Sequence, residues 1–176
     1  MSTTPANTAD GPDIRHARWR IDPGRSSVEF HVRNLYGLQT VKGRFERYDG
    51  TLDLDAEPSI ELAIDADSLN TNNAKRDEHL RSADFFDAAS HPQVRFTSEL
   101  ATLEDERLRV RGELHAAGKS TPIDLEGVIR PDGDELDIDV TTFADHRELG
   151  MTWNRLGMLR GPSKLIVRGR LVRDDR

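Results

Sequence analysis

The feature that most constrains this chain is a period-two alternation of apolar and polar residues, which runs from about Ala17 almost to the C-terminus. Residues 27–32, for example, place Val28, Phe30 and Val32 on one side of a strand and polar residues on the other. Comparable alternation recurs at residues 51–55, 60–65, 94–96, 108–115, 123–129, 136–140 and 164–171. Such alternation predicts strands with one buried and one wet face, as in an antiparallel sheet.

Short polar segments separate these strands and are typical of hairpin turns. We expect turns at 48–50, 104–106, 118–119 and 131–134. About eight or nine closely spaced strands with one apolar face must stack into a sandwich or curl into a barrel. Closure removes the exposed edges that invite aggregation, so the pattern favours an all-β antiparallel barrel. Side chains can just fill an eight-stranded barrel, or it can hold one small ligand.

Four glycines fall on the apparently inward faces of the predicted strands: Gly43, Gly112, Gly127 and Gly169. A glycine at such a position either lets the strand bend sharply or leaves room inside the sheet. The pattern alone does not choose between these two roles.

One stretch breaks the alternation and has a helical pattern. We expect a short helix at about 73–82, with Asn72 or Asn73 as its N-cap, and Phe85 and Phe86 follow it. In one interpretation this helix lids one barrel end and the phenylalanines plug the core. In the other it gates a cavity mouth and offers Arg76, His79 or Arg81 to an anionic head group.

Composition narrows the class of protein. The 176 residues suit one domain, and residues 1–16 are small, polar and dotted with proline and glycine, so we expect a disordered tail before a domain spanning 17–176. The net charge of −7 argues against nucleic acid as a partner and against non-specific attachment to an anionic membrane. No apolar run is long enough for a signal peptide or a membrane span, so we expect a cytoplasmic protein without stable membrane insertion.

Motifs for catalysis or cofactor binding are weak. There is no cysteine, the six histidines form no metal-ligand motif, and no serine has the surroundings of a nucleophile elbow. The Gly-Lys-Ser at 118–120 has the wrong glycine spacing for a phosphate loop and lies between two predicted strands. We therefore expect no cofactor, no metal and no enzymatic activity. An enzymatic alternative would need a polar cluster drawn from Arg76, Asp77, His79 and Arg147.

Several longer motifs carry a resemblance to a known family. They are WRIDPGRSSVEFHV at 19–32, VKGRF at 41–45, SLNTNNAKRDEHLRSADFFD at 68–87, HPQVRFTS at 91–98, VRGEL at 110–114 and LGMTWN at 149–154. With these motifs the chain resembles the YceI-like family of polyisoprenoid-binding proteins, over about residues 19–173. It departs from the family pattern at Leu149, where phenylalanine is common, and at 161–163, where Gly-Pro-Ser replaces Val-Gly-Asp.

The resemblance implies an eight-stranded antiparallel barrel with a lipocalin-like hollow. It also implies a long apolar ligand, such as an isoprenoid lipid or a quinone, with no catalytic residues, and a homodimer is common for such barrels. We expect a non-catalytic binding or carrier protein. The alternative is a filled-core barrel that serves as a stress-response or protein-interaction module. The candidate ligand-binding residues are Phe30, Val32, Phe45, Leu62, Arg76, His79, Phe85, Phe86, Phe96, Val110, Leu114 and Ile138.

Overall fold

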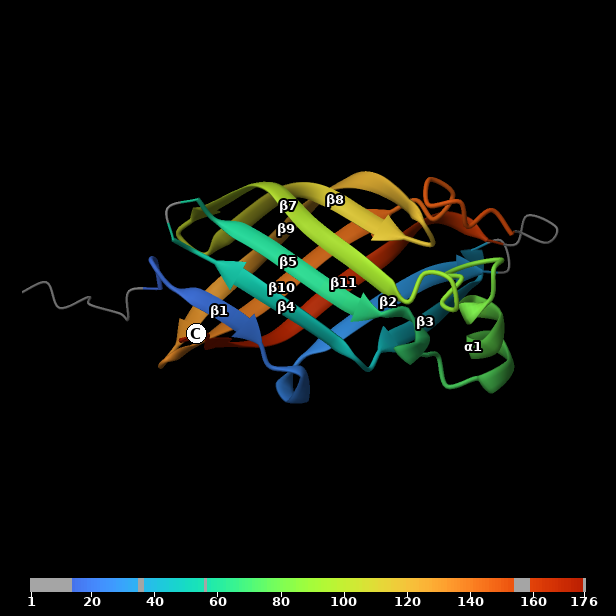
Figure 1. Cartoon of the computed structure of the whole chain (residues 1–176), viewed down its shortest axis with the longest axis horizontal. Coiled ribbons are helices and arrows are strands. Elements are labelled where there is room, and N and C mark those ends of the chain that lie inside the picture. Colours follow the sequence, from blue (N-terminus) through green and yellow to red (C-terminus); the bar gives the residue numbers. More distant parts are fainter. Residues whose placement is uncertain (1–13, 35–36, 56, 154–158, 176) are drawn as a thin grey trace, which may run out of the picture.

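Strands form throughout the alternating segments and pair, neighbour to neighbour, around a closed ring (Figure 1). The structure is a computed structural model, and it describes residues 14–34, 37–55, 57–153 and 159–175. Its strands are β1 (Arg18–Ile21), β2 (Ser27–Asn34), β3 (Gln39–Phe45), β4 (Tyr48–Asp53), β5 (Ser59–Asp65), β6 (Leu69–Asn70), β7 (Gln93–Glu104), β8 (Arg107–Ala116), β9 (Lys119–Asp132), β10 (Glu135–Ala144) and β11 (Arg160–Arg173). Every pairing is antiparallel, and the pairing of β1 with β11 closes the ring.

These segments make eight barrel strands, because three of the eight are interrupted. β1 and β2 both lie against β11, as the pairs Ile21 with Leu171 and Val28 with Val167 show. β3 with β4 and β5 with β6 likewise form two broken strands. The predicted eight-stranded antiparallel barrel is confirmed.

The turn predicted at 48–50 is wrong, because this segment belongs to β4. The bend lies at Glu46 and Arg47, where both backbone N–H groups donate to the Ser68 hydroxyl at 3.2 and 3.0 Å. Tyr48 and Gly50 instead pair with β5. Turn-forming residue types were overridden here by tertiary pairing, since Tyr48 starts the inward-facing series that continues through Gly50 and Leu52.

The single α-helix of the described residues, α1 (Ala74–Arg81), lies at one barrel end, as predicted (Figure 1). The Asn73 side chain caps it by accepting a hydrogen bond from the Arg76 N–H at 3.0 Å. The Arg81 guanidinium donates to the carbonyls of Asp67 and Leu69, which ties the helix to the end of the β5–β6 strand. The β2–β3 hairpin lies at the same end, which we call the mouth.

The opposite end is filled and is called the closed end. Trp19, Leu52, Leu108, Ile129 and Leu136 are each at most 2% exposed there, and they come from strand ends next to the termini and to the β7–β8 and β9–β10 turns. Side chains therefore fill this end of the barrel.

Residues 1–13 lie outside the described residues, so the disordered tail stays a prediction. From Ile14 on the chain is attached to the closed end: the Ile14 carbonyl accepts a hydrogen bond from the Trp19 indole at 3.3 Å, and the His16 N–H donates to the Leu54 carbonyl. Residues 154–158 also lie outside the described residues.

The inward glycines Gly43 and Gly112 allow a side chain of the neighbouring strand to approach the backbone closely. A Cβ at Gly43 would lie 2.2 Å from the Phe30 ring, and one at Gly112 would lie 2.5 Å from the Phe96 ring. The outer edge of each ring thus lies against a glycine of the neighbouring strand, a device that holds bulky rings against a sheet. The room left by Gly43 and Gly112 is occupied by aromatic carbon, whereas Gly127 lies against Val140 and Gly169 against Ser26.

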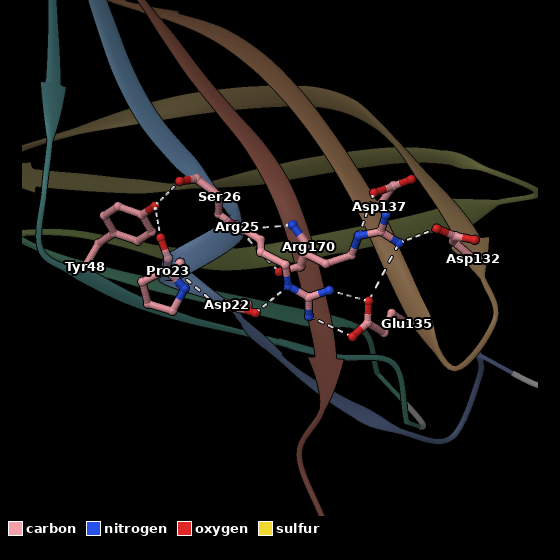
Figure 2. A network of polar contacts seen from close by, with 10 residues as sticks. Asp22, Pro23, Arg25, Ser26, Tyr48, Asp132, Glu135, Asp137 and Arg170 are labelled. Atoms are coloured by element: carbon pink, nitrogen blue, oxygen red, sulfur yellow. Dashed lines mark hydrogen bonds and ion pairs between the residues drawn. The ribbon is translucent and has the colours of Figure 1, made fainter.

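A polar network holds the corner where β1 turns into β2 (Figure 2). The Arg25 guanidinium donates to both Glu135 carboxylate oxygens at 2.7 and 2.9 Å and to Asp22 at 2.7 Å. These hydrogen bonds hold the pKa values of Asp22 and Glu135 below their ordinary range. Burial raises the pKa of the neighbouring Tyr48, whose hydroxyl donates to the Ser26 carbonyl at 2.7 Å. We call the Arg25, Asp22 and Glu135 cluster the corner clasp.

Candidate functional site: an apolar cavity with a polar rim

A cavity of about 450 Å³ runs from the mouth down the barrel interior, as far as Ile21, Leu52 and Leu171 near the closed end. Its walls are strand side chains that face inward, and Leu52 belongs to its floor beside the filled core of the closed end. The residues at its other limit include Asn34, Lys75 and Trp153, which belong to the mouth. The barrel is thus filled at one end and hollow at the other.

Most residues that the sequence singled out lie on this cavity. Those in its lining are Phe30, Val32, Phe45, Leu62, Arg76, His79, Phe85, Phe86, Phe96, Leu114 and Ile138. Val110 does not line it: its side chain is 3% exposed in the core, two residues before Gly112 on β8. Ligand contact by any of the twelve stays a prediction.

Three phenylalanine rings form one packed wall of the cavity. The centroids of Phe30 and Phe45 lie 5.4 Å apart, and Phe86 meets them edge-on at 6.4 and 5.7 Å. Phe86 follows α1, and its N–H donates to the Leu80 carbonyl. The helix end is therefore fixed to the barrel wall through an aromatic contact, which adds to the area that each ring buries.

A second set of rings forms the rim. The His79 imidazole lies 4.4 Å from the Trp153 ring and 5.2 Å from the Phe85 ring, centroid to centroid. His79 Nε2 also lies 2.8 Å from an Asp84 carboxylate oxygen. These contacts join α1, the segment after it and the connection between β10 and β11 at the mouth.

Arg76 and Asp77 are both engaged by Thr71. The Arg76 guanidinium donates to the Thr71 hydroxyl and carbonyl at 2.8 and 2.9 Å. Asp77, 8% exposed, accepts from the Thr71 N–H at 2.9 Å and from its hydroxyl at 2.5 Å. Asp77 is absent from the cavity lining, so of the two only Arg76 is placed to meet a bound molecule.

His146 lines the cavity, and the sequence reasoning missed it. Its Nδ1 is buried and has no hydrogen-bond partner among the described residues. Burial lowers its pKa, so the ring is neutral near pH 7. The neighbouring Arg147 guanidinium hydrogen-bonds Asp145 and lowers the pKa of that carboxyl to about 2. A lone histidine without a motif partner carries no sequence signal for such a position.

Trp153 and Lys75 were also missed as lining residues, although both lie in motifs that carried the family resemblance. The polar cluster that a catalytic interpretation would need does not assemble from its four candidates. Arg147 is exposed and paired with Asp145, and His79 is paired with Asp84 at the solvent-exposed rim. Within the described ranges no three histidine or acidic residues converge as a metal site.

The family model for the YceI-like domain matches residues 19–170 of this chain. The chain belongs to the YceI-like family. Relatives include the protein YceI of Escherichia coli O157:H7, 36% identical over 61% of this chain and 58% of its own length. The YceI of Salmonella arizonae is 35% identical over 68% of this chain and 65% of its own length. The chain thus spans less than two thirds of the length of these relatives.

Solved structures show the same fold. Burkholderia cenocepacia BcnA superposes with a TM-score of 0.78 at 16% identity, over 85% of this chain and 98% of its own. A polyisoprenoid binding domain from Saccharophagus degradans, implicated in plant cell wall breakdown, gives 0.70 at 17% identity over 91% and 100%. The YCEI protein of Campylobacter jejuni gives 0.68 at 23% identity over 79% and 88%. None of the helices described in our YceI-like chain has the length and apolar character needed to cross a bilayer.

Proposed function

We propose that this YceI-like protein binds one long apolar molecule in the barrel cavity and shields it from water as a carrier. The observation that carries the proposal is the 450 Å³ cavity, whose walls include Phe30, Phe45, Phe86 and Phe96. Each CH₂ group that moves from water into such a cavity contributes about 0.8 kcal/mol. A chain of several isoprene units therefore gains affinity from burial alone.

The filled closed end of the barrel sets the direction in which a molecule can enter. The closed end blocks passage, so an apolar tail enters first and the polar head stays at the rim. Lys75, Arg76, His79 and His146 are among the polar side chains of the lining, and His146 Nδ1 has no hydrogen-bond partner within the part of the chain that the structure describes. This combination suits an isoprenoid lipid or a quinone-like molecule, and the name of the Saccharophagus degradans domain supports the isoprenoid class.

The proposed role is non-catalytic and needs no cofactor. The described residues that face the cavity offer no buried pair of ionisable groups at hydrogen-bond distance, which is the arrangement acid–base catalysis draws on. The alternative of a fully filled barrel does not match the 450 Å³ cavity. A cytoplasmic location and a homodimer stay predictions from the sequence.

The test combines ligand extraction with a blocked cavity. Protein purified from its native host is extracted with organic solvent, and the extract is identified by mass spectrometry. Ala144→Trp places a large ring in the cavity lining and should abolish the recovered lipid. Phe143→Trp is the matched control, because Phe143 is the next residue on β10, faces outward and is 59% exposed.

Val32→Phe provides a milder block if Ala144→Trp proves too destabilising, since Val32 lines the cavity and is only partly buried. Recovery of no apolar molecule from repeated preparations would refute the proposal. So would a lipid that Ala144→Trp and Val32→Phe retain as fully as Phe143→Trp does.

A further inference from the structure

The two ends of the barrel differ in charge. At the closed end, the β4–β5 connection carries Asp55 and Glu57, the β7–β8 turn carries Asp105 and Glu106, and the β9–β10 turn carries Asp134. All three connections lie at the barrel end opposite α1 (Figure 1). Cations at this end pair with some of the acids, Arg130 with Glu106 and His16 with Asp55, both at 3.3 Å. Glu57, Asp105 and Asp134 have no ion-pair partner among the described residues, so this end presents uncompensated negative charge.

The mouth carries exposed cations. Arg33 and Lys42 lie on the two strands of the β2–β3 hairpin, and Lys75 lies on α1. None of the three has a carboxylate at ion-pair distance within the part of the chain that the structure describes. Of the acids on α1 and just after it, Asp77 is engaged by Thr71 and Asp84 by His79, whereas Glu78 on α1 is exposed.

Two large apolar side chains are exposed at the same end of the barrel. Leu38, at the β2–β3 connection, is 90% exposed, and Trp153 at the rim is 37% exposed. Trp153 lies against His79 of α1 and against Phe85, and Arg160, the first residue of β11, pairs with Arg33. Cations beside exposed leucine and tryptophan have the composition of surfaces that bind the interface of anionic bilayers. We call Arg33, Leu38, Lys42, Lys75 and Trp153 the mouth surface.

We propose that the mouth surface docks on an anionic lipid bilayer, with Leu38 and Trp153 in the headgroup layer and the three cations against lipid phosphates. Docking in this orientation directs the acidic closed end away from the membrane. It also places the cavity mouth on the bilayer, so that an apolar molecule passes between membrane and cavity without crossing water. The net charge of the chain predicted no attachment to anionic membranes. A net charge does not describe how charge is distributed between the two ends of the barrel, and the mouth surface depends on that distribution.

The inference extends the proposed carrier function to a partner, but its test measures membrane association and not the content of the cavity. Either proposal can therefore fail alone. The purified chain is sedimented with vesicles of phosphatidylcholine mixed with phosphatidylglycerol and, separately, with vesicles of phosphatidylcholine alone. We expect binding to the mixed vesicles, weakened by salt, and little binding to the neutral ones.

Variants locate the contact. Arg33→Glu and Lys42→Glu each replace a cation of the mouth by an anion. The loss of one cation near the surface weakens binding about fivefold, so each reversal should weaken it by at least that factor. Arg107→Glu is the charge-matched control, because it makes the same change in net charge at the closed end. Leu38→Ser should also weaken binding, whereas Leu100→Ser, on the outer wall of β7 and 62% exposed, should not.

Tryptophan fluorescence gives a second measurement. The chain has two tryptophans, and Trp19 is only 1% exposed in the core, so Trp153 should account for any blue shift on vesicle binding. The proposal is overturned if neutral and anionic vesicles bind alike, or if mouth and control variants bind alike. It is also overturned if Leu38→Ser changes the oligomeric state on gel filtration and leaves vesicle binding intact, because the surface would then join two copies of the chain.

Discussion

The close approach of the Phe30 ring to Gly43 allows a quantitative prediction. An alanine Cβ at position 43 would lie 2.2, 2.6 and 2.9 Å from three carbons of the Phe30 ring, whereas ordinary contacts begin at 3.4 Å. The nearest ring carbon must therefore move by about 1.2 Å, the difference between 3.4 and 2.2 Å. The ring already packs on Phe45 and Phe86, so it must displace them or swing into the cavity.

The expected cost follows from this forced movement. Overpacking of a well-packed interior costs about 1–3 kcal/mol. Gly→Ala within a strand would otherwise stabilise by about 0.5–1 kcal/mol, so only the clash can reverse the sign. For Gly43→Ala we expect a net loss of about 1–2 kcal/mol in the free energy of unfolding, or a fall of about 2–8 °C in the melting temperature of a chain this size.

The assay is urea unfolding of a double-mutant cycle. Phe30→Leu shortens the side chain that lies against residue 43. In the double variant, Gly43→Ala should therefore lower the free energy of unfolding only slightly. We expect a coupling energy of about 1 kcal/mol or more. Gly24→Ala is the control, because its Cβ would meet only Asp22, at 3.3 Å, and should change stability by less than about 0.5 kcal/mol. A Gly43→Ala variant at least as stable as wild type, or additive effects in the cycle, would refute the reasoning.

Two further predictions concern pH. Arg25 lowers the folded-state pKa values of Asp22 and Glu135, so the stability that these carboxyls contribute is present above about pH 4 and is lost as they protonate. Arg25→Gln should lower the melting temperature at neutral pH, and the difference from wild type should vanish in acid. Arg109→Gln, on the outer face of β8, is the control. An equal loss in that variant would contradict a specific contribution of the corner clasp. Burial lowers the folded-state pKa of His146, so stability should be complete above about pH 6.5 and fall as the pH drops below it. Urea unfolding on both sides of that pH should show a weaker dependence for His146→Gln, and an unchanged slope would exclude His146 as the cause.

Local patterns predicted the barrel well because each strand repeats the same period. The helix at 74–81 was equally predictable, because Asn73 is a typical N-cap and the strand alternation stops there. The failure at Tyr48 has a clear reason: Asp49 and Gly50 favour a turn only when no ladder is available, and β5 provides one. Whether inward side chains meet or leave a gap depends on the whole ring of strands, so the separation of Val110 from the cavity could not be read from β8 alone.

The rim was harder to predict than the walls. Phe85 and His79 were recognised from one short block, but their partner Trp153 lies about seventy residues later along the chain. The orphaned Nδ1 of His146 is likewise a property of burial, which results from packing between distant segments. In an antiparallel meander, successive connections lie at alternating ends of the barrel. The difference in charge between the two ends is therefore visible only once the fold is known.

The continuous strand β11 has a consequence for biosynthesis. Its fourteen residues pair with β1, β2 and β10, so the strand of the barrel that is synthesised after the other ten closes the ring. Until it emerges, β2 and β10 expose unpaired edges, and edges of this kind recruit other strands. Pairing across almost the whole sequence also makes closure slow. A nascent chain that has not yet reached Arg160 would hence be an open sheet without an enclosed cavity, prone to join its neighbours on the polysome.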